Sequence, residues 1–180
     1  MSLVNYVKIT DIDPGVRKLV INLNRIPGVY TQTTCEGHVW REVPAWPTKD
    51  GWVHFQKSRK QHDRLVVSID DYCRDNAIFT LTDRTWKGQN EIDEYTINGL
   101  FEPHQGDDGL KPFDEMTRRE QNAYWKQADA RMIEILKGWN ELNQVVIRYI
   151  RENIGISTSK LPYRDKNDKT DFRCFCGMCR

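Results

Sequence analysis

Apolar residues recur at helical spacing in two segments of the first half of the chain. In the first segment, Asp13-Pro14 is typical of a helix start, and Pro27-Gly28 is typical of a helix end. In the second, Ser58 and Gln61 have the spacing of a capping box, and an apolar stripe follows over residues 65–73. The pattern predicts two helices, one between the first pair of signals and one beginning near Ser58.

A much longer stripe follows Thr117 and Glu120, which form a second capping box. From Trp125 to Tyr149 the apolar positions step by three and four without interruption, so we expect one helix over 118–153. Such a helix would be about 50 Å long, longer than the ~40 Å width expected for a chain of this size. Either part of it projects and pairs with a second copy in a homodimer, or a wide stripe simply covers the sheet.

Shorter apolar and alternating runs predict four strands, which lie between the helices. These runs cover residues 29–35, 52–56, 77–82 and 92–97. We therefore expect an α/β fold: a small mixed sheet with flanking helices, a long C-terminal helix and a cysteine-rich tail. Residues 1–155 would form a single domain that includes the long helix, and residues 156–180 would form a polar tail.

Composition narrows the class of protein. Charged residues make up 29% of the 180 residues, and no run of eighteen apolar residues occurs, so we expect no membrane segment. No basic segment followed by an apolar run opens the chain, which favours a cytoplasmic location with reduced or metal-bound thiols for the five cysteines. The net charge of +1 provides no overall basic field for nucleic acid.

The most informative motif is Cys35-Glu36-Gly37-His38, which begins at the last residue of the strand predicted over 29–35. Open α/β folds tend to place their sites where strands end. Cys35 and His38 could be metal ligands, or Cys35 could be a nucleophile with His38 or His54 as its base. Glu36 could act as a general acid or base. In the alternative interpretation, Cys35 is a buried core residue beside exposed polar neighbours.

Tryptophans and basic residues follow this motif. The rings could stack on a base, and the cations could bind phosphates, which points to a nucleotide or RNA ligand. Core or rim packing is the commoner role of tryptophan. The residues of this predicted ligand surface are Trp40, Trp46, Trp52, Lys57, Arg59 and Lys60.

The tail carries Cys174-x-Cys176-x-x-Cys179. Three thiolates can bind one zinc ion, which needs a fourth ligand from Cys35, His38 or His104, or from a partner chain. We favour Cys35 or His38, because Gly37 lies beside them. The alternative is a free terminus with reactive thiols.

Residues Ile21-Asn22-Leu23-Asn24, followed by the stretch from Pro27 to His38, resemble a known family. Over residues 19–56 the chain is similar to the tRNA wybutosine-synthesising methyltransferases of the third pathway step. The resemblance implies that Thr33, Thr34, Cys35 and Gly37 belong to a pocket for S-adenosylmethionine and tRNA. The chain has Glu36 and His38 where the family has serine and arginine. The Cys-Glu-Gly-His signature is also similar to that of small uncharacterised bacterial and phage proteins.

Two functional hypotheses follow from these motifs. The first is a nucleotide- or RNA-directed enzyme, similar to a methyltransferase, with its pocket at Cys35–His38. The second is a non-enzymatic metal-binding or assembly protein that dimerises through its long helix. No glycine-rich phosphate loop, Gly-x-Ser-x-Gly elbow or His-Glu-x-x-His helix occurs in the sequence, which argues against P-loop nucleotidases, serine hydrolases and zincin proteases.

Overall fold

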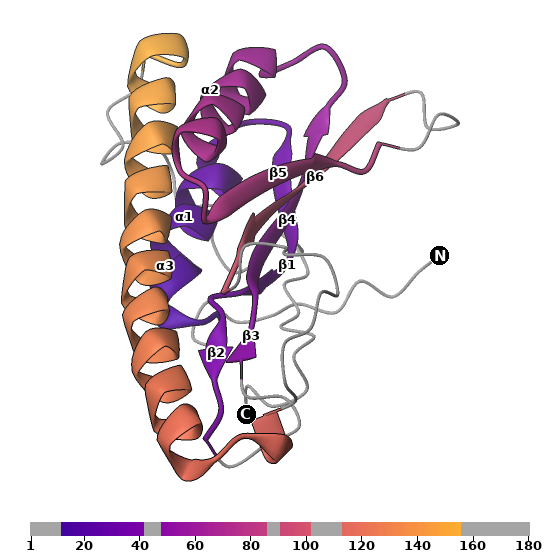
Figure 1. The fold of residues 1–180 in the computed structure, drawn as a ribbon. Helices are drawn as coiled ribbons and strands as arrows, with labels where there is room; N and C mark the ends of the chain where they lie inside the picture. The colour runs from indigo at the N-terminus through magenta and orange to yellow at the C-terminus, as the bar shows by residue number, and fades with distance from the viewer. Residues whose placement is uncertain (1–11, 42–47, 86–90, 102–112, 156–180) are drawn as a thin grey trace.

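The chain forms two layers, with a sheet on one side and helices on the other (Figure 1). The helices are α1 (Pro14–Arg25), α2 (Asp63–Asp75) and α3 (Arg118–Asn153). This computed structural model describes residues 12–41, 48–85, 91–101 and 113–155. Among them, no helix has a segment long and apolar enough to cross a membrane.

The main sheet has four strands in the order β1-β4-β6-β5. Its strands are β1 (Val29–Cys35), β4 (Gly51–Ser58), β5 (Phe79–Asp83) and β6 (Ile92–Gly99). A two-stranded ribbon of β2 (His38–Val39) and β3 (Thr48–Lys49) lies between β1 and β4 in the sequence. The α/β class is confirmed. All pairings of the described strands are antiparallel, so the parallel pairs of a mixed sheet are not found in this part of the chain.

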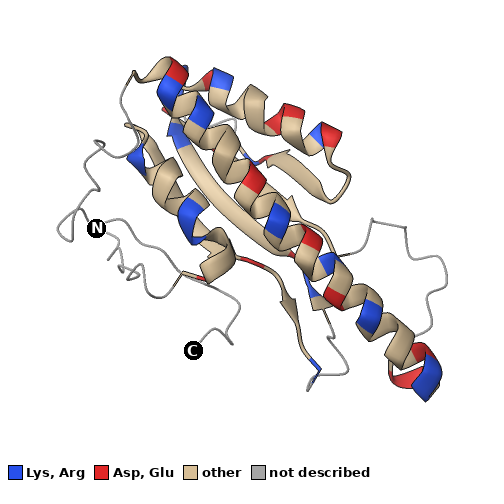
Figure 2. Ribbon diagram, turned by 90° about the vertical axis from the view of Figure 1, so that its left-hand side faces the viewer, with Lys and Arg blue, Asp and Glu red and all other residues tan. Residues whose placement is uncertain are grey.

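Strand β4 shows why the sheet has one helical face. Val53 and Phe55 are fully buried towards the helices, whereas Trp52 and His54 point to the opposite face, which no described helix covers. Helix α1 packs against β1, and α2 packs against β5. Helix α3 runs between α1 and α2 (Figure 2). The apolar core therefore lies between β4 and β6 on one side and all three helices on the other.

Helix α3 has the predicted boundaries. The Thr117 N–H donates to the Glu120 carboxylate, and the Glu120 N–H donates to the Thr117 hydroxyl, so the predicted capping box is confirmed. The stripe from Ala128 to Ile150 is buried inside the chain. The helix extends past the sheet at its N-terminal end (Figure 1), where the rings of Tyr124 and Trp125 pack on Phe113. Dimerisation through α3 stays a prediction.

The capping box predicted at Ser58 is wrong. Ser58 belongs to β4, where it pairs with Ile92, and its carbonyl accepts a hydrogen bond from the Gln61 N–H. Helix α2 begins only at Asp63, after His62 in a left-handed conformation. Because Ser58 is paired as a strand residue, it does not cap helix α2.

A close helix–sheet contact generates the first prediction. A Cβ atom on Gly138 of α3 would lie 2.1 Å from Cε2 of Phe79, which is itself buried against Trp139. Gly138→Ala should therefore lower the free energy of unfolding by about 1–3 kcal/mol, although alanine alone favours a helix by about 1 kcal/mol. Urea denaturation measures this change.

The control is Asn140→Ala at an exposed position of the same helix, which should change stability by no more than about 0.5 kcal/mol. A Gly138→Ala protein as stable as the wild type would show that α3 does not approach Phe79 this closely.

Candidate metal centre at the end of strand β1

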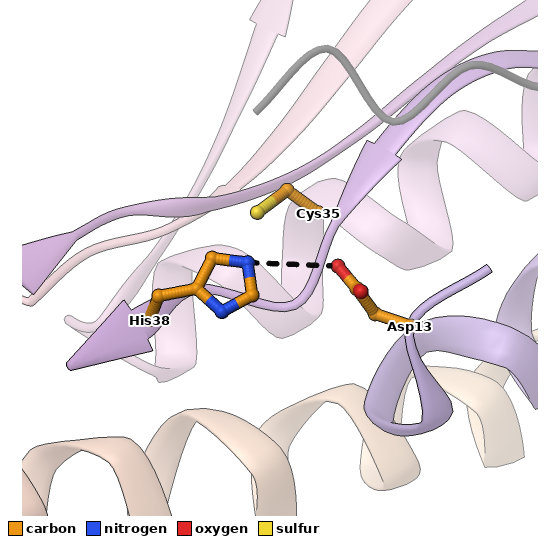
Figure 3. Close-up of side chains that lie close together, drawn as sticks. All are labelled: Asp13, Cys35 and His38. Carbon is orange, nitrogen blue, oxygen red and sulfur yellow. Dashed lines mark ion pairs between the residues drawn. The ribbon is translucent and has the colours of Figure 1, made fainter. Parts of the chain in front are cut away.

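Three side chains of different chemistry converge where β1 ends and α1 begins. One ligand atom each from Asp13, Cys35 and His38 lies within 4.8 Å of the other two. Figure 3 shows the Cys35 sulfur, the His38 ring and the Asp13 carboxylate facing a common point. Cys35 is fully buried, and the side chains of Asp13 and His38 are 11% and 19% exposed. The group therefore lies at the margin of the core, largely shielded from solvent.

Asp13 is positioned by a reciprocal tie between α1 and the end of β1. It occupies the N-cap position of α1, but its carboxylate makes no capping bond to its own helix. Instead its Oδ2 atom accepts from the Glu36 N–H at 3.1 Å, while the Glu36 carboxylate accepts from the Gly15 N–H at 2.5 Å. The Asp13 side chain thus bonds to the backbone at the end of β1, and the Glu36 side chain bonds to the backbone at the start of α1. These two hydrogen bonds orient Asp13 towards Cys35 and His38.

The turn after Cys35 is held tightly in place. The Glu36 carbonyl accepts from the Trp139 indole N–H of α3 at 3.0 Å. Gly37 has a φ of +95°, which favours glycine. A Cβ atom on Gly51 would lie 2.6 Å from the Glu36 carbonyl oxygen. The motif therefore needs glycine at both positions to bring its backbone against β4.

His38 reaches the group from strand β2. Its Nε2 atom lies 3.8 Å from Asp13 Oδ2, and its ring stacks on Trp40 with centroids 5.4 Å apart. Lys49 of β3 is its direct cross-strand partner, so the two side chains lie on one face of the ribbon. The Lys49 ammonium lies over the rings of Trp40 and Trp52, at 5.7 and 4.9 Å from their centroids.

The arrangement favours metal binding over nucleophilic catalysis. A Cys-His-Asp triad uses one imidazole nitrogen for the nucleophile and the other for the carboxylate. Here Nε2 faces Asp13 and lies on the side of the ring nearer the Cys35 sulfur, and Nδ1 points away from both (Figure 3). Ligands of a tetrahedral zinc ion lie about 3.5 Å apart. A thiolate, an imidazole and a carboxylate within 4.8 Å need only a small contraction to reach that spacing.

The structure does not bring Glu36 and His54 into this group. The Glu36 carboxylate is directed to the start of α1, and burial raises its pKa; the Gly15 N–H bond opposes that rise, and the nearby Asp13 adds to it. His54 lies farther along β4, where its Nε2 atom is buried, makes no hydrogen bond within the described structure, and is 3.8 Å from Glu94. Burial lowers the pKa of His54, with Arg84 acting in the same direction and Glu94 against it.

The other residues of the motif have structural partners. The Thr33 hydroxyl accepts from the Trp52 indole N–H at 3.3 Å. Thr34 is 2% exposed and pairs with Val53 on the helical face of the sheet. Gly37 packs against Phe101 and the backbone of β3 and β4.

The structure separates Trp52 from Lys57, Arg59 and Lys60 of the predicted ligand surface. Trp52 lies at the start of β4, whereas Lys57 lies near its end and Arg59 and Lys60 follow it, roughly 20 Å away at the rise of a strand. Lys57 is 1% exposed and donates to Asp63 and Asp93 at 2.7 Å each. Arg59 also approaches Asp93, at 3.6 Å. Lys57 is therefore part of a buried ion-pair network rather than a surface ligand for phosphate.

Several predicted residues lie outside the described part of the chain. They are Trp46, His104, Cys174, Cys176 and Cys179. Cys73 of α2 is part of the buried core, and burial, with a smaller effect of Asp70, raises the pKa of its thiol to about 12.

Sequence reasoning missed Asp13 and Lys49. Asp13 precedes proline at a helix start, which is a sufficient structural reason for an aspartate. Lys49 precedes the Asp50-Gly51 turn signal, and only the pairing of β2 with β3 places it opposite His38. The available signal is that Cys-x-x-His alone supplies too few ligands for a metal ion, so a further ligand such as a carboxylate must come from elsewhere in the chain.

Comparisons with protein-family models, curated proteins and solved structures found no match to this chain. The methyltransferase resemblance therefore stays a prediction.

The Lys57 network generates the second prediction. Lys57→Met should lower the free energy of unfolding by about 2–3 kcal/mol, because the nearly buried Asp93 would lose its 2.7 Å bond to the ammonium and keep only the more distant Arg59. Burial alone would lower the pKa of Lys57, but its bonds to Asp63 and Asp93 leave the pKa raised above 10.5. The stabilisation is thus fully present at pH 7 and is lost only as the pH rises through the folded-state pKa.

Chemical denaturation at pH 7 measures the effect. Lys60→Met, at an exposed position three residues away, is the matched control and should change stability by less than about 0.5 kcal/mol. Equal stability of the two variants would contradict a structural role for Lys57.

Proposed function

We propose that this chain is a metal-binding protein whose centre is formed by Asp13, Cys35 and His38, with zinc as the preferred ion. The convergence of one sulfur, one nitrogen and one oxygen donor within 4.8 Å carries the proposal. Zinc accepts all three donor types in tetrahedral geometry. Thiolate and imidazole together disfavour magnesium and calcium, which prefer oxygen ligands.

The surroundings of the donors support this function. Metal-bound carboxylates are usually oriented by further hydrogen bonds, and the Glu36 N–H supplies one to Asp13. The ring of His38 is held by its stacking on Trp40. Because these contacts orient the donors before any ion arrives, binding would require little rearrangement.

Three protein ligands leave one position of a tetrahedral ion open. Zinc centres that keep such a position bind water or a substrate there, whereas structural zinc centres use four protein ligands. The proposed centre therefore has the ligand number of a catalytic zinc site, provided that no other residue of the chain completes it.

Elemental analysis of untagged protein, dialysed against zinc, tests the centre. The wild type should bind one equivalent, and Asp13→Asn, Cys35→Ser and His38→Gln should each bind zinc at least about tenfold more weakly, because each removes one donor. Asp13→Asn is the mildest change, since an amide oxygen can still accept the Glu36 N–H bond.

His54→Gln is the matched control, because His54 is a second partly buried histidine outside the group. It should retain full zinc binding. Zinc that persists in all three ligand variants, but is lost when Cys174, Cys176 and Cys179 become serine, would move the site to the tail.

A second candidate function is action on a nucleotide or RNA, for which S-adenosylmethionine would be the co-substrate in the methyltransferase version. Trp40 and Trp52 favour it, because both rings lie beside the donor group and are only partly buried. Aromatic rings of this kind can stack on bases.

Isothermal titration calorimetry of the full chain with S-adenosylmethionine and with tRNA tests this function. Binding of either ligand that weakens at least about fivefold in Trp52→Ala would support it, since one stacked base contributes about 1–3 kcal/mol. Absence of binding at millimolar S-adenosylmethionine, and at tens of micromolar tRNA, would reject the methyltransferase version.

A further inference from the structure

The surface next to the donor group carries a lysine whose ammonium lies over two aromatic rings. Lys49 extends over Trp40 and Trp52, and it makes no ion pair with any described residue. Contact with two rings removes part of the water around the ammonium, so its charge acts over a longer distance than that of a fully hydrated lysine. A positive charge held in this way is suited to an anionic group of a ligand.

Strand register places this cation beside the proposed centre. His38 and Lys49 are direct partners in the ribbon, which puts their Cβ atoms about 4.5–5.5 Å apart on one face. Cys35 and Trp52 are direct partners in the main sheet. The first pair therefore places the donor His38 beside Lys49, and the second places the donor Cys35 beside Trp52.

We propose that the open metal position and Lys49 together bind one phosphate group, and that Trp52 receives the planar ring of a nucleotide carrying it, because Trp40 is already stacked on His38. This inference rests on the proposed zinc centre and names its ligand class. Phosphate oxygens bind both zinc and lysine ammonium groups, which act as paired positive charges on one anion. The Trp52 ring beside Lys49 then favours a phosphorylated ligand that also carries a base.

This placement replaces the phosphate site predicted from the sequence. Lys57 is occupied by Asp63 and Asp93 at the far end of β4, whereas Lys49 lies at the same end as Trp52 and the donor group. One cation, one metal position and two rings therefore meet within a single region of the fold.

Calorimetric titration of zinc-loaded full-length protein with AMP, adenosine and orthophosphate tests the inference. AMP should bind about tenfold or more tightly than adenosine, because adenosine lacks the group that zinc and Lys49 hold. AMP that binds about tenfold more tightly than orthophosphate identifies a nucleotide as the source of the phosphate. Equal affinities for AMP and orthophosphate identify free phosphate as the ligand and overturn the role of the tryptophan ring.

Lys49→Gln should weaken AMP binding about tenfold or more while leaving zinc stoichiometry unchanged. Lys60→Gln, an exposed lysine beyond the far end of β4, is the matched control and should leave both unchanged. Zinc-loaded protein that binds AMP and adenosine equally, or a Lys49→Gln protein that binds AMP as well as the wild type, would overturn the inference alone. Failure to take up zinc would overturn the proposed centre and this inference together.

Discussion

The arrangement of the site depends on the hydrogen bonds of Glu36. Its N–H bonds to Asp13, its carboxylate to the N–H of Gly15, and its carbonyl to the indole of Trp139. One residue therefore joins the end of β1 to the start of α1 and to the middle of α3. Since buried backbone groups need hydrogen-bond partners, moving any of these three elements would leave a polar group of Glu36 unsatisfied.

This junction explains why donors that are distant in the sequence meet. Cys35 and His38 lie on either side of the turn that Glu36 holds, and Asp13 is drawn to them by the Glu36 N–H. In parallel α/β sheets a site arises where crossovers diverge at strand ends. The main sheet here is antiparallel, so the site has a different origin: a helix start packed against a strand end.

Local signals in the sequence predicted most of the fold. Helix α3 follows from a capping box and an uninterrupted stripe, because both act within a few residues and agree with each other. Strand β4 follows from strict alternation. The same kind of signal failed at Ser58, where pairing with β6 prevented the helix that the capping box predicted.

The site was only partly predictable for the same physical reason. Cys35 and His38 are close in the sequence, so their proximity could be inferred. Asp13 and Lys49 join them only through tertiary contacts, the first through Glu36 and the second through the pairing of β2 with β3. Lys57 shows the converse, because its two carboxylate partners turn an apparent surface cation into a buried structural one.

X-ray absorption spectroscopy at the zinc edge tests the central claim most directly, because it counts the sulfur atoms bound to the metal. A centre formed by Asp13, Cys35 and His38 predicts one sulfur neighbour, with nitrogen and oxygen atoms completing the shell. A shell of three or four sulfur atoms, or one without sulfur, would contradict the account and show that the ion is held elsewhere in the chain.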